Sequence, residues 1–250
     1  MTFAEALAAL EQRTDEALGR LEQDGQWAAA LACYQAAGAD LEALAIPRAD
    51  AAYKPARRLC AFLYLRQANA LRALGRHAEA RPLADLELSA ALASGDRLSI
   101  SRDMVSLGTT CVANGEVARG LQLLADAGPM FAHHDDVEHR EGLGWWHIIQ
   151  ADLSNLNLSP APPEQALTDA EAALALLRPL ENWPGVARAH LARAAALTRL
   201  ERPADARVAE TAGRMAEALA ANYRPPERSH EPRQYPLGPC EPPAAKDDLA

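Results

Sequence analysis

Histidine and acidic side chains are concentrated between residues 133 and 139. The candidate ligands in this stretch are His133, His134, Asp135 and His139. Imidazole nitrogens and carboxylate oxygens bind transition metals, and a bound metal can activate water for hydrolysis. One hypothesis is therefore a metal-dependent helical hydrolase. The alternative is a polar turn, in which Asp135 or Asp136 caps the following helix and places negative charge at its positive end.

Other catalytic motifs are missing from the sequence. There is no G-x-S-x-G nucleophile motif, and no cysteine lies in a recognisable reactive context. The phosphate-binding patterns G-x-x-x-x-G-K and G-x-G-x-x-G do not occur either, so we expect no cofactor. His147 and His190, which a metal hydrolase would recruit, lie in apolar helical sequence. These observations favour a non-enzymatic protein.

The elements that must position these residues are helices. Hydrophobic residues make up 49% of the 250-residue chain, and apolar positions recur at i, i+3, i+4 and i+7 almost throughout. Ala, Leu, Arg and Glu are abundant and β-branched residues are scarce, which predicts an all-α fold. The predicted helices cover residues 2–23, 26–45, 51–73, 77–93, 97–113, 117–132, 137–157, 163–180, 184–200 and 203–223.

The charge balance excludes some classes of partner. The net charge of −9 lacks the basic character of a nucleic-acid-binding module and disfavours anionic membrane surfaces. The sequence has no apolar run of about 18 residues that could span a membrane. Its four cysteines form no C-x-x-C pair, and the N-terminus lacks a basic segment with an apolar core. We therefore expect a cytoplasmic protein with no nucleic-acid and no membrane partner.

The last stretch of the chain differs from the rest. Residues 224–250 are rich in proline and show no helical periodicity. Such a segment buries too little apolar surface to offset the entropy of ordering it. We expect a helical domain over residues 1–223 and a disordered or extended tail over 224–250. The tail is either a docking peptide or an inert terminus.

Turn residues return at intervals of about 40 to 50 residues, which indicates a repeat protein. The predicted turns lie near Gly25, Gly75, Gly115, Ala161 and Glu201. Each turn joins two predicted helices, so the domain divides into five hairpins. The first hairpin shows the pattern of small and large residues most clearly, at Gly25, Trp27, Ala30, Tyr34 and Ala37. Small residues let paired helices approach closely, and large ones fill the space opposite.

This pattern resembles the tetratricopeptide repeat (TPR) family, over roughly residues 5–223. The period of about 40 residues is longer than the usual 34 and is similar to the degenerate repeats of bacterial regulators and sensor modules. The resemblance implies a right-handed superhelix, an α-solenoid of about five helix-turn-helix hairpins. It also implies a scaffold or adaptor that holds a peptide or helix of a partner protein in a concave groove.

The resemblance also implies which side chains line that groove. Carried onto this sequence, the groove positions are Phe62, Arg66, Asn69, Arg72, Arg102, Ser106, Arg188 and Arg199. Arg and Asn on one helical face can grip a carboxylate, and some family members clamp a ligand's terminal carboxylate at the positions of Arg66, Asn69 and Arg102. The alternative is that these arginines are solvated or pair with neighbouring acids.

The first hairpin offers a different set of groove side chains. These are Gln12, Asp15, Glu16, Glu22 and Gln23. The groove would then run from acidic to basic, which would orient a bound peptide.

The first-choice function is therefore a non-enzymatic scaffold that binds a protein or peptide. A regulatory sensor that couples ligand binding to a separate effector protein is the second hypothesis. The metal-dependent hydrolase built on the cluster from His133 to His139 is the third.

Overall fold

The computed structural model describes residues 2–22 and 24–220, and these residues form an all-α fold. Ten α-helices and one π-helix lie in the described part of the chain, each close to its predicted bounds. They are α1 (Phe3–Glu16), the π-helix η1 (Ala17–Glu22), α2 (Trp27–Ala43), α3 (Tyr53–Ala73), α4 (His77–Ser94), α5 (Arg97–Ala113), α6 (Val117–Phe131), α7 (Val137–Asn155), α8 (Pro163–Leu177), α9 (Trp183–Arg199) and α10 (Pro203–Ala220). The predicted tail, 224–250, lies outside the described residues.

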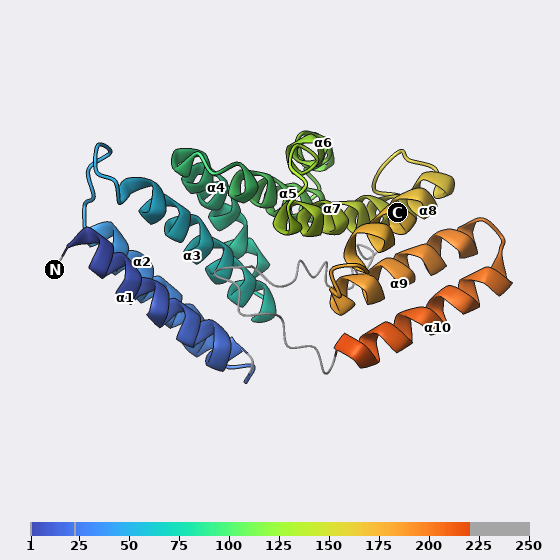
Figure 1. Ribbon diagram of the computed structural model, residues 1–250, viewed down its shortest axis with the longest axis horizontal. Coiled ribbons are helices and arrows are strands. Elements are labelled where there is room, and N and C mark those ends of the chain that lie inside the picture. The colour runs from blue at the N-terminus through green and yellow to red at the C-terminus, as the bar shows by residue number, and fades with distance from the viewer. Residues whose placement is uncertain (1, 23, 221–250) are drawn as a thin grey trace, which may run out of the picture.

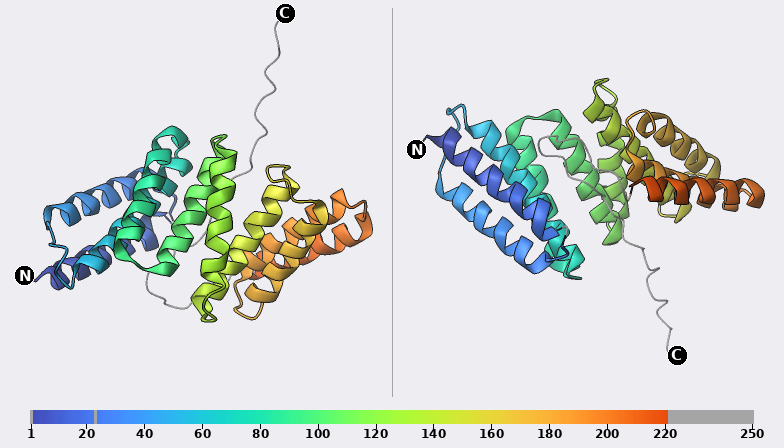
Figure 2. Two further views of the ribbon diagram at one scale, coloured as in Figure 1. Left: turned by 90° about the horizontal axis from the view of Figure 1, so that it is seen from above. Right: turned by 60° about the horizontal axis from the view of Figure 1, so that its bottom comes forward.

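The helices pack as five consecutive hairpins. The continuous helix formed by α1 and η1 pairs with α2, and the other hairpins are α3 with α4, α5 with α6, α7 with α8, and α9 with α10. The hairpins follow one another around an arch, with α1 and α2 at one end and α9 and α10 at the other (Figure 1). Two further views show the same stacking in chain order along the long axis (Figure 2).

A left-handed residue closes the first helix of each hairpin. Gly75 has a φ of 73°, and its N–H bonds to the carbonyl of Arg72 while that of Arg76 bonds to Leu71. Gly25 and Gly115 make the same pair of bonds. This Schellman arrangement satisfies carbonyls at the helix end, and glycine adopts it without steric cost.

The fourth turn corrects one prediction. Its left-handed residue is Asn157, with a φ of 56°, and the residue predicted there, Ala161, lies four positions further on. Asn tolerates this conformation better than most residues with a Cβ atom, so the turn has no glycine to mark it. In the fifth hairpin the left-handed residue is Glu201, as predicted, with a φ of 57°.

The core is a series of clusters between neighbouring helices. Small residues set the spacing within hairpins: a Cβ atom added to Gly120 would lie 2.5 Å from the carbonyl oxygen of Gly108. The adjacent indoles of Trp145 and Trp146 are both partly buried, and each packs against a different hydrophobic cluster. Trp146 lies against Gly128 and donates from Nε1 to the carbonyl of Leu124 at 2.7 Å. Aromatic packing on glycine therefore joins the third and fourth hairpins.

None of the helices in the described ranges combines the length and hydropathy needed to cross a membrane.

Candidate functional site

The histidine-rich turn is a helix cap in the structure. Asp136 is the N-cap of α7, and its Oδ1 accepts a hydrogen bond of 2.9 Å from the backbone N–H of His139. The same carboxylate lies 2.7 Å from Nδ1 of the His139 ring. These bonds, the backbone bond foremost, hold the pKa of Asp136 below its ordinary value. The capping interpretation of this turn is therefore confirmed.

The side chains proposed as metal ligands do not converge on one point. Ring centroids of His133 and His134 are 4.9 Å apart in an edge-on arrangement, and those of His134 and His139 are 4.7 Å apart with the rings tilted. The side chain of Asp135 is 95% exposed and faces Arg140 at 3.6 Å. Within residues 2–22 and 24–220, no group of three or more His, Cys, Asp or Glu side chains could hold a metal ion.

His147 and His190 lie in other surroundings. His147 Nδ1 bonds to Asp169 at 2.8 Å within the fourth hairpin. His190 is buried beside Arg178, and burial together with the charges of Arg178 and Arg193 lowers the pKa of its imidazole. Neither histidine is brought to the turn that holds His133, so the structure gives the hydrolase hypothesis no assembled site.

Arg66 corrects a prediction, because the structure places it in the core. Its side chain is 4% exposed and forms an ion pair with Glu22 of η1, with Nε 2.9 Å from Oε1. The hydroxyl of Tyr34 donates to the same oxygen at 2.6 Å. Burial lowers the pKa of Arg66 to about 10 and raises that of Tyr34. Both Arg66 and Glu22 were predicted to face a ligand, but they join the first hairpin to the second.

Asn69 and Arg72 form part of a link between the second and third hairpins. Arg72 donates from Nη1 to Asn69 Oδ1 at 2.6 Å and from Nη2 to Thr110 Oγ1 at 3.0 Å. Burial lowers the pKa of the Arg72 guanidinium, and the negative charge of Glu87 opposes that shift. Both predicted residues remain half-buried, so their polar groups are fixed but not fully enclosed.

The third hairpin contributes one buried and one half-buried candidate. Ser106, predicted to line the groove, is 2% exposed and donates to Glu87 Oε2 at 3.3 Å. Arg102 is half-buried on α5, as Phe62 is on α3. The position of Ser106 is a second correction, because its hydroxyl is used inside the protein.

Arg188 and Arg199 link the fourth and fifth hairpins. Arg188 donates from Nε and Nη2 to Asp152 Oδ2, at 3.1 and 2.8 Å. Its side chain is still 41% exposed, whereas that of Asp152 is 11% exposed. Arg199 donates to Asn157 Oδ1 at 2.9 Å and also to the carbonyl of Ser154. These arginines are anchored at one side and open to solvent at the other.

The sequence interpretation missed two buried acids, Glu87 and Asp103. Glu87 is fully buried and Asp103 is 5% exposed. A signal was present in the sequence, because Ala80, Ala84 and Glu87 repeat the spacing of Ala30, Tyr34 and Ala37. Glu87 therefore occupies a position that the repeat buries.

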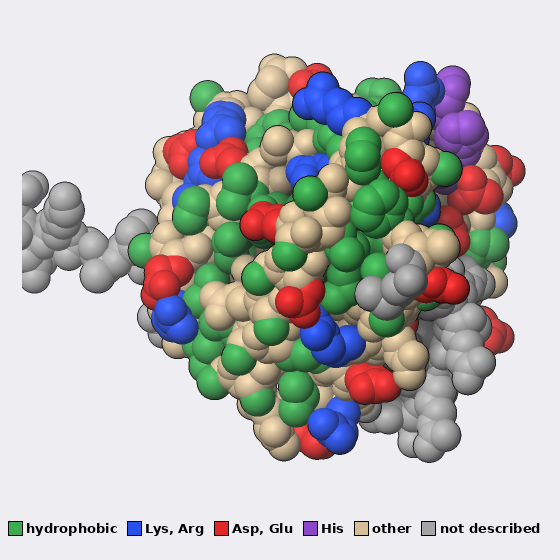
Figure 3. Space-filling view, turned by 90° about the vertical axis from the view of Figure 1, so that its left-hand side faces the viewer, with side chains coloured by type: hydrophobic (Ala, Val, Ile, Leu, Met, Phe, Trp, Pro, Cys, Tyr) green, Lys and Arg blue, Asp and Glu red, His purple; other side chains and the backbone are tan. Residues whose placement is uncertain are grey.

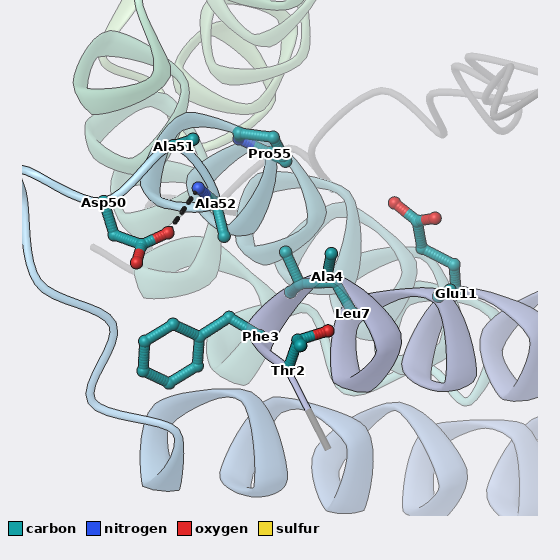
Figure 4. Close-up of a pocket in the computed structure, with 10 residues that line it drawn as sticks. Thr2, Phe3, Ala4, Leu7, Glu11, Asp50, Ala51, Ala52 and Pro55 are labelled. Carbon is teal, nitrogen blue, oxygen red and sulfur yellow. Dashed lines mark hydrogen bonds between the residues drawn. The ribbon is translucent and has the colours of Figure 1, made fainter.

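An open pocket of about 660 Å³ lies at the N-terminal end of the arch. Phe3 and Leu7 of α1 face Ala52 and Pro55 at the start of α3 across it (Figure 4). From this end of the molecule, hydrophobic side chains are spread among acidic and basic ones without forming a single patch (Figure 3). The lining is mostly apolar, and its polar members are Thr2, Glu11 and Asp50, of which Asp50 accepts a hydrogen bond from the backbone N–H of Ala52.

Solved structures with the same architecture come from repeat proteins. BtubC (BKLC) from P. vanneervenii is 13% identical, with a TM-score of 0.61, over 95% of this chain and 100% of its own. A putative kinesin light chain from Podosopora anserina, with nearly identical TPR-like repeats, is 18% identical, with a TM-score of 0.59, over 87% of this chain and 99% of its own. A variant of that protein is 17% identical, with a TM-score of 0.61, over 87% and 98%.

The sequence matches no family model, and no curated protein is similar enough to match it. At these identities the likeness to solved structures concerns the fold. The hairpin order, the left-handed turns and these structures agree: the chain has the fold of TPR-like helical repeat proteins.

Proposed function

We propose that this protein is a non-enzymatic scaffold that binds a peptide or helix of a partner protein. The binding surface is the inner face, defined here as the side formed by α3, α5, α7 and α9. The observation that supports it best is Arg188, which Asp152 holds in place while 41% of the side chain stays exposed. A guanidinium that is already fixed loses less conformational entropy when it binds a carboxylate.

The half-buried residues of the inner face favour an acidic or carboxylate-bearing ligand at the later hairpins. Arg102 and Arg188 provide positive charge there, while Asp15 and Glu16 are exposed on α1 at the other end. The predicted gradient from acidic to basic is weaker than the sequence alone indicates, because Glu22 and Arg66 neutralise each other. We infer that a bound peptide places its acidic segment near α5 to α9.

A display library of random peptides tests this proposal on the full chain. Peptides enriched on the wild type are expected to be acidic and to bind Arg102→Ala and Arg188→Lys variants about tenfold more weakly. Hydrogen bonds to charged groups contribute about 1.5–3 kcal/mol, and Lys cannot reproduce the planar fork of Arg.

Arg207→Ala is the matched control, since Arg207 is an exposed arginine on α10. Circular dichroism checks that each variant keeps its helices. The proposal is wrong if the enriched peptides bind both inner-face variants as tightly as the wild type, or if Arg207→Ala weakens binding equally.

A further inference from the structure

Two carboxyl groups are buried against each other where the second and third hairpins meet. Glu87 comes from α4 and Asp103 from α5; both side chains are buried where these helices pack, and each acts electrostatically on the other. Two carboxyl groups can share a hydrogen bond only when one of them carries a proton. Ser106 donates to Glu87 Oε2, but no N–H or O–H group of the described residues reaches Glu87 Oε1 or Asp103 Oδ2.

The other junctions of the solenoid are apolar at these two positions. The equivalent pairs are Ala37 with Leu63, Ala127 with Trp145, and Ala173 with Ala189. The second residue of each pair lies twelve positions before the left-handed residue of its own hairpin, just as Asp103 lies twelve positions before Gly115. Ala37 and Leu63 share one hydrophobic cluster, and Ala173 and Ala189 share another. The acids therefore replace core side chains at a single joint.

The surroundings do not neutralise the pair. Arg72 of α3 faces Glu87, Arg102 of α5 faces Asp103, and Asp96 at the start of α5 adds negative charge. Burial outweighs the two arginines: it raises the pKa of Glu87 well above 4.5 and that of Asp103 from 3.8 to about 7. The pair thus keeps its protons as the pH rises from acidic toward neutral.

We propose that Glu87 and Asp103 form a proton-controlled joint in the solenoid. While both carboxyl groups are protonated, α4 and α5 pack closed. When one proton leaves to solvent, a negative charge is left among buried carboxyl oxygens without water, and the free-energy cost of enclosing that charge separates the second hairpin from the third. Opening at one junction of an arch changes its curvature, and with it the spacing of side chains along the inner face.

The direction of the pH effect follows from raised carboxyl pKa values. A group that holds its proton more tightly when folded contributes full stability below its unfolded pKa. That contribution is lost as the pH rises through the folded value. For this pair the free energy of unfolding is therefore expected to fall between about pH 4 and pH 8.

The test measures urea unfolding and small-angle X-ray scattering at about pH 5 and about pH 8. The wild type is expected to have a lower urea midpoint and a larger radius of gyration at the higher pH. Asp103→Asn, which keeps the shape but cannot ionise, is expected to lose most of both changes. Glu217→Gln, at an exposed glutamate of α10, is the matched control and should behave as the wild type.

Glu87→Gln, whose amide can donate to Asp103, is the second variant and is expected to reduce both changes if Asp103→Asn does not fold. The proposal is overturned if the wild type and the foldable joint variant show the same shift of midpoint with pH. It is also overturned if the midpoint falls while the radius of gyration of the wild type stays constant.

Discussion

The first and second junctions of this solenoid use the same backbone positions with opposite chemistry. Ala37 meets Leu63 at the first junction, and both side chains are almost fully buried. Glu87 and Asp103 occupy the matching positions at the second junction and are equally enclosed. Burying a leucine contributes about 1.5–3 kcal/mol, whereas burying a carboxyl group costs free energy unless it is protonated or paired. The repeat thus determines which positions are buried at each junction, but not whether the side chains at those positions are apolar or ionisable.

The first junction has a polar contact of its own, but of another kind. Arg66 and Glu22 bring opposite charges together, so this pair is satisfied while both groups are ionised. Glu87 and Asp103 bring like groups together, and this buried pair is uncharged only while both carboxyl groups are protonated. Of these two junctions, the second is therefore the one expected to respond to pH near neutrality, and the following predictions address that contrast.

The largest effect is expected at the opposite-charge pair. Arg66→Met should lower the free energy of unfolding by about 3–5 kcal/mol, because it leaves the Glu22 carboxylate buried without a partner. Urea unfolding near neutral pH measures this loss. The double variant Arg66→Met with Glu22→Leu should recover much of it. A single variant as stable as the wild type would show that Glu22 is not enclosed as described.

A smaller effect of opposite sign on the free energy of unfolding is expected when the second junction is given the apolar residues of the first. Glu87→Ala with Asp103→Leu copies the Ala37 and Leu63 pair. We expect this change to raise the free energy of unfolding near neutral pH by about 1–4 kcal/mol, as found when buried ionisable groups are replaced by packed apolar ones. Chemical denaturation at one pH is sufficient, and a loss of stability would contradict the prediction.

The smallest effect is expected at a carboxylate whose pKa shifts the other way. Asp136 caps α7 and has a lowered pKa, so its contribution is present above its unfolded pKa and is lost in acid. Asp136→Ala should cost about 1 kcal/mol at neutral pH and less at low pH. Thermal unfolding across the acidic range follows this difference. A cost that grows as the pH falls would argue against the cap.

Much of the fold was predictable, because helix period and turn residues are local signals. The breakers near Gly25, Gly75 and Gly115 mark the hairpins, and the structure confirms them. The fourth turn was predicted at the wrong residue because Asn157 replaces glycine in the left-handed region. Local signals of this kind are sufficient to locate the helices, but they misplace a turn whose left-handed residue is not glycine.

The candidate site was less predictable, because it depends on contacts between distant residues. Family positions indicated which helix carries Arg66, but its partner Glu22 lies 44 residues earlier in the chain. The sequence alone does not reveal that counter-ion. The same holds for Ser106, whose hydroxyl bonds to Glu87 of another hairpin. The half-buried Arg102 and Arg188 remain a prediction for the inner face.

Direct observation of the carboxyl groups tests the contrast between the two junctions most sharply. Carbon-13 NMR of side-chain carboxyls, assigned with Glu87→Gln and Asp103→Asn, follows their protonation as the pH is raised. We predict that Glu87 stays protonated well above its ordinary pKa and that Asp103 titrates near 7. If both carboxyls instead titrate near 4, as exposed acids do, the buried joint does not exist in solution.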